Sequence, residues 1–385
     1  MPSASRFDLE IDRRDSWSTK WNRYGDRDVL PFWVADMDFR APDCVLDAVR
    51  TRLDHGVLGY TQIPAPLTEA FRAWLQRGYG WQVPKEWLVW LPGVVTGLNL
   101  SAMAAATPQG SVLIPTPVYY PFLAVPNNAQ QQPIHVGMQR SGERWVIDFD
   151  AMGKAVKPHT RLIMISNPQN PTGRAYSRAE LTELAAFAER HDLIICSDEI
   201  HCSLILDDKT VHTPIASLSE VVAKRTITLF AATKTYNIPG LSCAVAVIPD
   251  AKLRMRFKAA RRDLVPGIGP LAFAASAAAF NDQSDWVPSL VAYLRGNHAR
   301  LAEVAGLRMT PVEATYLAWI DVSDLGLDDP AAYFEQHGLG LSDGRPFAGP
   351  GFVRFNFGCP RAQLERGLER LEKALQVRGE HAQGR

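Results

Sequence analysis

Short apolar runs rich in β-branched residues alternate with helical patterns between residues 111 and 248 of this chain. The runs lie at 111–115, 133–136, 161–166, 192–197, 226–230 and 243–248. Several are almost continuously apolar, which is typical of strands covered on both faces. Between two of them, residues 177–192 have a helical pattern in which Ser177 is the N-cap and Glu180 completes a capping box. The alternation predicts an α/β fold with a mostly parallel sheet and helices on both faces.

A change of composition near residue 285 predicts a second, smaller domain. An Ala-rich segment without charges, 271–280, is followed by a polar helix through 285–300 and by a charged amphipathic helix from residue 360. The first 45 residues are too irregular to extend the central sheet. We therefore expect a large domain over 46–284 and a small α+β domain built from 1–45 and 285–385, in line with a chain of 385 residues.

Charge and cysteine content exclude several classes of protein. Lys plus Arg total 41 and Asp plus Glu total 41, which argues against a broadly basic nucleic-acid-binding protein. The five cysteines contain no C-x-x-C pair, so neither a disulfide framework nor a thiolate metal site is expected. A polar, charged N-terminal segment without a signal-like apolar run favours a cytoplasmic protein.

One long uncharged segment tests the expectation that the protein does not enter membranes. No Asp, Glu, Lys or Arg occurs from Trp87 to Gln139. Pro92, Gly93 and Asn99 interrupt its most apolar part, and Pro-rich turns follow directly. These interruptions favour a buried core over a membrane span.

Ligands of parallel α/β sheets bind beyond the carboxyl ends of the strands, so the loops there are the candidate sites. The N-P-T-G turn that begins at Asn170 follows one strand, and Asp198, Glu199 and His201 follow the next. Strand alternation sends the two carboxylates in opposite directions, so at most one faces a shared ligand. A surface turn and a strand-end ion pair are the structural alternatives.

Two basic residues complete the set. Lys234 follows a strand and precedes an N-x-P-G turn, and a desolvated lysine in such a position can become a Schiff-base nucleophile. Arg354 alternates with apolar residues in a strand near the C-terminus. A cation in such a strand requires an anion, either a structural Asp or Glu or the carboxylate of a ligand.

Taken in order, these motifs resemble the fold-type I pyridoxal-phosphate (PLP) enzymes of the class I/II aminotransferase superfamily, over nearly the whole chain. Within it, the sequence is most similar to the cystathionine β-lyase or C–S lyase group of the MalY/PatB type. The segments that carry this narrower resemblance are 30–39 (LPFWVADMDF), 55–61 (HGVLGYT), 92–99 (PGVVTGLN), 115–122 (PTPVYYPF) and D-E-I-H at 198–201.

The resemblance implies a PLP-dependent transferase-like fold and a role for each matching residue. Lys234 would hold PLP as an internal aldimine and move the Cα proton. Asp198 would keep the pyridine nitrogen protonated, and Asn170 would bond the phenolic oxygen. His201 is a second candidate for that oxygen. Arg354 would bind the substrate carboxylate.

Further matches concern the cofactor ring and phosphate. Tyr119 would stack on the ring, and Tyr120 beside it would face the substrate in a catalytic role, with ordinary packing as the alternative. The phosphate would meet the helix start formed by Val94, Val95 and Thr96; Thr233 would add a hydroxyl.

The resemblance also implies a homodimer, because Tyr60 matches a tyrosine that reaches the phosphate of the partner subunit. The sequence departs from the superfamily at Ser242, where many members have an arginine that meets the phosphate. The residue that replaces this arginine is not identified by the sequence. Trp33 and Phe347 line the substrate crevice or fill the core, and burial tendencies favour the core.

The implied reaction is β-elimination from cystathionine or a similar cysteine S-conjugate, which yields a thiol, pyruvate and ammonia. An aminotransferase that converts an amino acid to a keto acid is the alternative. A second alternative is a regulatory or binding module that retains PLP. The expected substrate is a small amino acid, with no metal, nucleic acid or membrane involved.

Overall fold

The computed structural model describes residues 5–383, with side chains up to residue 377. Its largest sheet has seven strands in the order β2-β10-β9-β8-β7-β3-β4. All are parallel except β10, which is antiparallel to both of its neighbours. The strands are β2 (Leu88–Leu91), β3 (Ser111–Thr116), β4 (Gln132–Gly137), β7 (Thr160–Ser166), β8 (Ile194–Asp198), β9 (Thr226–Phe230) and β10 (Ala244–Val247).

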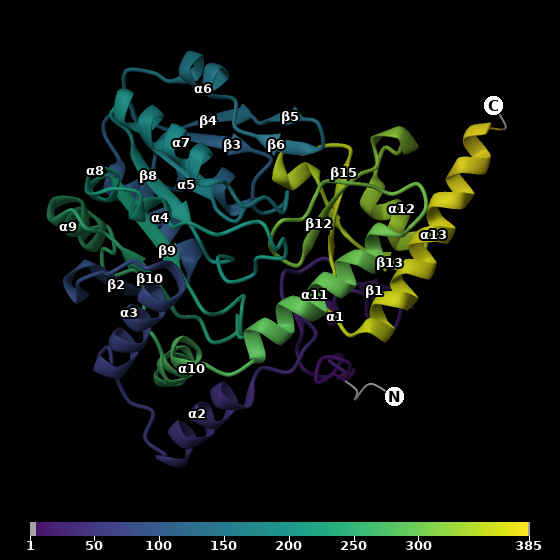
Figure 1. Cartoon of the computed structure of the whole chain (residues 1–385), viewed down its shortest axis with the longest axis horizontal. Helices are drawn as coiled ribbons and strands as arrows, with labels where there is room; N and C mark the ends of the chain where they lie inside the picture. Colours follow the sequence, from purple (N-terminus) through teal and green to yellow (C-terminus); the bar gives the residue numbers. More distant parts are fainter. Residues whose placement is uncertain (1–4, 384–385) are drawn as a thin grey trace.

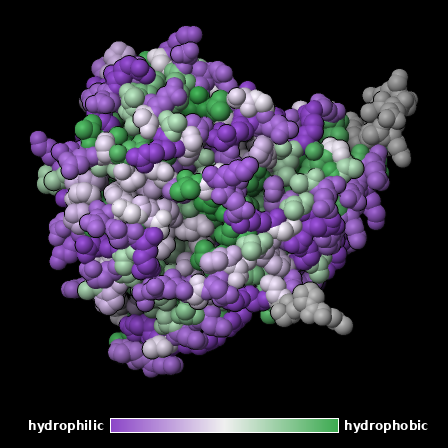
Figure 2. Space-filling model, in the orientation of Figure 1, coloured by the Kyte–Doolittle hydropathy of each residue, from purple (hydrophilic) through white to green (hydrophobic). Residues whose placement is uncertain are grey.

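This sheet confirms the predicted α/β class and contains all six predicted strands. The sequence did not identify β2, whose four residues are all buried, because it lies inside the long uncharged segment where strand and buried helix have the same apolar signature. Figure 2 shows a largely hydrophilic face with hydrophobic residues in small groups. In the described part of the chain, no helix has the length and apolar character needed to cross a membrane.

Alternating residues of the strands pack against helices on the two faces of the sheet. Val112 and Ile114 belong to one buried cluster, whereas Leu113 between them belongs to another. The first face carries α4 (Val94–Ala105), α5 (Pro121–Asn128) and α9 (Ala251–Ala259), and the second carries α6 (Phe149–Ala155) and α7 (Arg178–Arg190). The capping box predicted at Ser177 and Glu180 is present at the start of α7.

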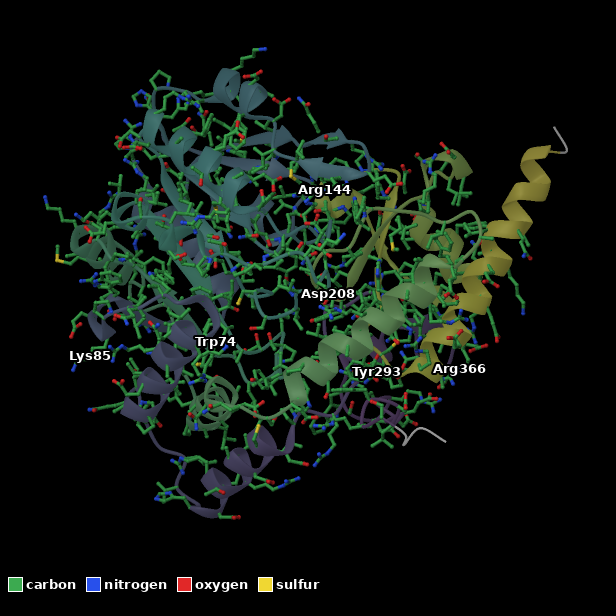
Figure 3. The ribbon with its side chains drawn as sticks, in the orientation of Figure 1. Trp74, Lys85, Arg144, Asp208, Tyr293 and Arg366 are labelled. Carbon is green, nitrogen blue, oxygen red and sulfur yellow. The ribbon has the colours of Figure 1, made fainter. Side chains whose placement is uncertain are left out.

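A second sheet forms from the C-terminal part of the chain. Its order is β11-β12-β15-β14 and all its pairs are antiparallel. Its strands are β11 (Arg308–Met309), β12 (Leu317–Asp321), β14 (Ser342–Asp343) and β15 (Phe352–Asn356), and its helices are α11 (Trp286–Ala302), α12 (Pro330–Gln336) and α13 (Arg361–Gln383). Tyr293 on α11 and Arg366 on α13 mark these two helices in Figure 3.

The N-terminal segment lies with this C-terminal region. β1 (Leu30–Pro31) pairs in parallel with β13 (Leu339–Gly340), and α1 (Thr19–Asn22) precedes it. In Figure 1 both lie beside α13, away from most of the seven-stranded sheet. This arrangement supports the predicted division of the chain at residues 45 and 284, which stays a prediction. Residues 1–4 and 384–385 of the predicted small domain lie outside the described part of the chain.

The remaining elements connect or cover these two regions. α2 (Asp43–Asp54) and α3 (Ala65–Tyr79) pack against α10 (Pro270–Asn281) beside the sheet. β5 (Gln139–Ser141) and β6 (Arg144–Val146) form a hairpin, and α8 (Glu220–Lys224) precedes β9. Short 3₁₀ helices occur at η1 (Lys85–Trp87), η2 (Ile215–Ser217), η3 (Ser323–Leu325) and η4 (Arg345–Phe347).

Candidate active site

The parallel strands place the predicted functional loops at one edge of the large sheet. β7, β8 and β9 run in the same direction, so Asn170, Asp198 and Lys234 follow or end neighbouring strands at that edge. A cavity of about 650 Å³ opens beside them. Its lining includes Tyr119, Tyr120, Lys234 and Arg354, together with residues from 33–35 and 341–347.

Lys234 has the environment of a nucleophilic lysine. Its Nζ atom donates a 2.6 Å hydrogen bond to the carbonyl oxygen of Ala35. Burial lowers the pKa of the Lys234 amine to about 8, with Arg354 acting in the same direction and Asp36 and Asp198 opposing it. About one tenth of the amine is then neutral at pH 7, and the neutral amine is the form able to attack a carbonyl carbon.

The two adjacent acids at the end of β8 face different surroundings, as strand alternation predicted. Glu199 is fully buried and accepts hydrogen bonds from Ser197 Oγ at 2.9 Å and the Ile215 amide at 3.1 Å; His212 Nε2 lies 2.8 Å from its other oxygen. Among the described residues, the Asp198 carboxylate accepts a hydrogen bond only from the Ile200 amide, at 3.1 Å. Glu199 is therefore a structural residue, and Asp198 is the carboxylate available to a ligand.

Burial raises the pKa of Asp198 to about 7, although the Ile200 amide and Lys234 act to lower it. A buried carboxyl group that is this costly to ionise gains most from a cationic partner. A protonated pyridine nitrogen would supply such a partner.

Arg354 resolves the alternatives that the sequence left open for it. The side chain is 3% exposed on β15, and no carboxylate of the described residues lies within 4.0 Å of its guanidinium. Its partners are Asn170 Oδ1 and the Trp33 carbonyl, both at 2.8 Å, and Ser342 Oγ at 3.3 Å. Burial lowers its pKa to about 10. Because no structural anion lies beside it in the described part of the chain, the cation is available for a ligand carboxylate.

Asn170 lies in a buried turn and not on the surface. It is 5% exposed, and Thr172 beside it is fully buried. The Gln169 side chain accepts hydrogen bonds from the amide of Thr172 at 2.8 Å and from its hydroxyl at 2.6 Å. Since Oδ1 of Asn170 is occupied by Arg354, the Nδ2 hydrogens remain as donors for a ligand.

The aromatic candidates differ in exposure. Tyr119 and Tyr120 line the cavity with their rings 4.9 Å apart, and Tyr120 is 50% exposed. His201 is buried, its Nδ1 has no hydrogen-bond partner in the described part of the chain, and its ring lies 5.9 Å from that of Tyr316. Burial, with Lys234 and Arg354 nearby, holds the pKa of His201 well below its ordinary value. The ring is therefore neutral.

The predicted phosphate site is a helix start without a side-chain cap. Gly93 precedes α4 at a φ of 123°, a conformation that favours glycine, and no side chain caps the amides of Val94, Val95 and Thr96. Thr233 is buried beside Lys234. These donors fit the phosphate of a bound group. Asp198 fits a ring nitrogen of that group, and Asn170 and the orphaned Nδ1 of His201 fit a phenolic oxygen.

Tyr60 is the predicted site residue that is most exposed to solvent. Its side chain is fully exposed, on a segment that follows α2. Ser242, at the position of the missing arginine, is also exposed and contacts the Pro239 carbonyl. Within the described residues, no group of three or more His, Cys, Asp or Glu side chains could hold a metal ion.

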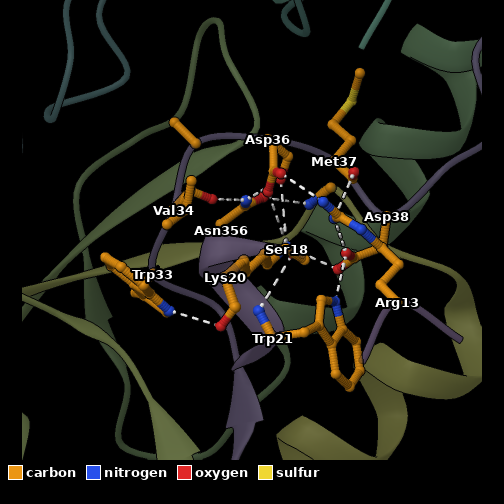
Figure 4. Close-up of polar contacts among 12 residues, drawn as sticks. Arg13, Ser18, Lys20, Trp21, Trp33, Val34, Asp36, Met37, Asp38 and Asn356 are labelled. Atoms are coloured by element: carbon orange, nitrogen blue, oxygen red, sulfur yellow. Dashed lines mark hydrogen bonds and ion pairs between the residues drawn. The ribbon is translucent and has the colours of Figure 1, made fainter. Parts of the chain in front are cut away.

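Sequence reasoning missed the wall formed by residues 33–38. Ala35 O accepts hydrogen bonds from Lys234 and, at 2.9 Å, from Tyr316 Oη. Asn356 Nδ2 donates to the carbonyls of Val34 and Asp36, as Figure 4 shows. Trp33 and Phe347 both line the cavity. The preference for a core role was wrong for the half-buried Trp33, whereas Phe347 is 2% exposed and so fills the core as well.

A buried ion cluster holds the far end of this wall. Lys20 Nζ lies 2.7 Å from Asp38 and 3.8 Å from Asp36, and its side chain is fully buried. Arg13 contacts the same two carboxylates at 2.5 and 2.7 Å (Figure 4). The only sequence signal for this ion cluster was segment 30–39, one of the segments that carry the family resemblance. The spacing of charged residues along the chain does not by itself identify a buried ion pair.

Comparisons with known proteins cover almost the whole chain. The family model for class I and II aminotransferases matches residues 27–371. Cystathionine β-lyase PatB of Bacillus subtilis (strain 168) is 36% identical over 387 residues, which cover 96% of this chain and 99% of PatB. The crystal structure of OvoB is 45% identical, with a TM-score of 0.93 over 96% of this chain and 98% of that chain. The structure of cystalysin from Treponema denticola, which contains pyridoxal 5'-phosphate, is 28% identical, with a TM-score of 0.91 over 96% and 98%.

Proposed function

The chain belongs to the family of class I and II aminotransferases, and on this premise we infer that it is a pyridoxal-phosphate-dependent carbon–sulfur β-lyase. Its substrate is cystathionine or a similar cysteine S-conjugate, which it converts to a thiol, pyruvate and ammonia. The names of relatives such as PatB and the C–S lyase structure from Staphylococcus hominis support this reaction.

The observation that carries the proposal is the buried, acid-free guanidinium of Arg354 in the cavity that also contains Lys234. A carboxylate bound to Arg354 places the Cα atom of an amino acid in the same cavity as the Lys234 amine. Amino-acid chemistry at Cα requires this combination of an anion site and a base.

Pyridoxal phosphate would be held by side chains and amides from several elements. The proposed set is Lys234, Asp198, Asn170, His201, Tyr119, Thr233, and the N-terminal amides of Val94, Val95 and Thr96. When bound, the cofactor withdraws electrons from Cα of the amino acid joined to it. Asp198 would supply the negative charge opposite its ring nitrogen, and Asn170 would donate to its phenolic oxygen.

The chain's own groups then move one proton and orient one leaving group. Arg354 binds the α-carboxylate, and the neutral amine of Lys234 takes the proton from Cα. The Cβ–S bond breaks with its electron pair leaving on sulfur as a thiolate. The thiolate then takes up the proton that Lys234 removed, which Tyr120 would relay from its half-exposed position. The three-carbon enamine that remains takes up water and gives pyruvate and ammonia.

We further propose a homodimer in a cytoplasmic setting, with each site completed by Tyr60 of the other subunit. The supporting observation is that Tyr60 is fully exposed in one chain, so its hydroxyl is free to reach a neighbouring phosphate. Sedimentation at several protein concentrations tests the assembly, and a monomer with full activity would contradict it.

The function is tested by measuring pyruvate release from L-cystathionine. Multiple turnovers with stoichiometric pyruvate support the lyase. Conversion of the bound cofactor to its amine form, with keto acid and no pyruvate, would favour the aminotransferase instead. Tight cofactor binding without either product would favour the regulatory module.

A further inference from the structure

Three basic side chains face the cavity without a carboxylate partner. Lys234 and Arg354 are two of them, and the proposed function assigns both. The third is Arg23, which lines the cavity and has no carboxylate within 4.0 Å in the described part of the chain. Arg345, by contrast, lines the cavity as a paired cation, 2.5 Å from Asp343 and 2.8 Å from Asp329.

Arg23 is held in place by an aromatic ring. It directly follows α1, and its guanidinium lies 4.4 Å from the ring centroid of Trp33. The indole Nε1 of Trp33 donates to the Lys20 carbonyl at 3.1 Å, which fixes the ring (Figure 4). An exposed cation that is positioned by a fixed ring and lacks an anion remains available for a ligand.

The same tryptophan connects the two unpaired guanidiniums. The Trp33 carbonyl accepts from the buried Arg354, whereas its ring lies against the exposed Arg23. One residue thus separates a cation in the interior of the cavity from a cation at its mouth. A ligand with two carboxylates joined by a chain fits this arrangement.

The cavity lining also contains a group of two acids and one base. Asp343 and Asp329 share the single cation Arg345, so the three side chains together carry one net negative charge. Both oxygens of Asp343 accept a hydrogen bond from Arg345, Oδ1 from its amide and Oδ2 from its Nε, and the side chain is 21% exposed, so its remaining lone pairs face a cation in solution. An unpaired cation and an unbalanced anion on one rim complement a zwitterion.

We propose that Arg23 and the Asp343–Asp329 pair bind the distal α-amino-acid group of the substrate, with Arg23 on its carboxylate and Asp343 near its ammonium. This proposal rests on the proposed lyase function and narrows its substrate class. The substrates are cysteine thioethers whose leaving thiol is itself an amino acid. Conjugates with neutral thiols lack the contacts that this rim provides.

The test uses four thioethers of one backbone. L-Cystathionine carries both distal charges, S-(3-carboxypropyl)-L-cysteine only the carboxylate, S-(3-aminopropyl)-L-cysteine only the ammonium, and S-propyl-L-cysteine neither. Pyruvate release gives kcat and KM for the holoenzyme and for the Arg23→Ala, Arg23→Lys and Asp343→Asn variants. Arg14→Ala, which alters an exposed arginine that is not among the cavity-lining residues, is the control.

We expect Arg23→Ala to raise KM about tenfold to a hundredfold for the two carboxylate-bearing thioethers, with kcat little changed and the other two unaffected. Arg23→Lys should restore part of the loss. Asp343→Asn should raise KM only for the two ammonium-bearing compounds. An equal effect on all four substrates, or none on cystathionine, would overturn the subsite.

Binding measurements separate this proposal from the function on which it rests. Calorimetry on Lys234→Ala protein loaded with the cofactor, with and without Arg23→Ala, reports dissociation constants without turnover. Failure of the wild-type protein to cleave any of the four compounds would refute the lyase. A selective loss of affinity for the distal carboxylates would still support the subsite, and equal affinities would reject it.

Discussion

The Nη1 atom of Arg354 donates a 2.8 Å hydrogen bond to Oδ1 of Asn170, and both side chains are buried. This bond settles which way the Asn170 amide points: its oxygen faces the arginine and its NH₂ group faces away. The two residues are separated by 184 positions in the chain. Their bond joins the edge of the large sheet to the C-terminal sheet beside the cavity.

Asn170→Asp should raise KM for cystathionine about tenfold to a hundredfold, because a carboxylate at this position competes with the substrate for Arg354. It should also remove the donor to the cofactor's phenolic oxygen and shift the pH at which the visible band of the holoenzyme titrates. Steady-state kinetics and absorbance titration measure both effects. Asn281→Asp, at an exposed helix end, is the control, and an unchanged KM in Asn170→Asp would contradict the assignment.

Asp198 and Glu199 should respond oppositely to substitution. Asp198→Asn should lower kcat at least about a hundredfold, since it removes the negative charge that we propose to lie opposite the cofactor's ring nitrogen. Glu199→Ala should instead lower the free energy of unfolding by about 1–3 kcal/mol, because Ile215 and Ser197 lose their buried acceptor. Kinetics and denaturant titration of both variants compare the two residues. Comparable effects on kcat would show that Glu199 also acts in catalysis.

The raised pKa of Asp198 also predicts the pH dependence of the cofactor-free protein. Since the folded-state value of about 7 lies above the ordinary 3.8, the folded state favours the protonated acid. Its contribution to stability is complete below pH 4 and is lost as the pH rises through 7. Asp198→Asn should remove this pH dependence in apoprotein denaturation curves, and an identical curve for both proteins would contradict the shift.

Cofactor uptake should report the lowered pKa of Lys234. The neutral amine is the nucleophile, so the rate at which apoprotein binds pyridoxal phosphate covalently should rise with pH and level off above about 8. Asp36→Asn should move the midpoint lower, because Asp36 supports the charged amine. Stopped-flow absorbance gives the profile. A midpoint near the ordinary lysine value of 10.5 would show that burial does not act on this amine.

Lys20→Met should destabilise the protein by about 1–3 kcal/mol, because it removes the 2.7 Å partner of the buried Asp38 while Arg13 stays 2.5 Å away. Guanidinium unfolding monitored by tryptophan fluorescence measures the change. Arg14→Ala breaks an exposed pair with Asp12 and should leave stability unchanged within error. Equal effects of the two substitutions would mean that the buried cluster is not what holds the wall of residues 33–38.

The sequence by itself determined the features that depend on local periodicity. Alternating apolar runs and helical patterns predicted the parallel sheet, and Ser177 with Glu180 predicted the start of α7, because spacing along the chain sets which face each side chain occupies. The strand ends then indicated Lys234, Asp198 and Asn170. The antiparallel direction of β10 and the strand β2 escaped this reasoning, since apolar content does not encode direction.

Only the tertiary structure decided which groups meet. Arg354 bonds to an amide and a carbonyl and not to an acid, and Ala35 O contacts Lys234 across 199 positions. Arg23 lies on the Trp33 ring without a carboxylate partner in the described part of the chain. All three arrangements depend on the packing of distant segments. A residue's type states what it can bind, but its partner is chosen by the three-dimensional arrangement of loops whose positions no local pattern encodes.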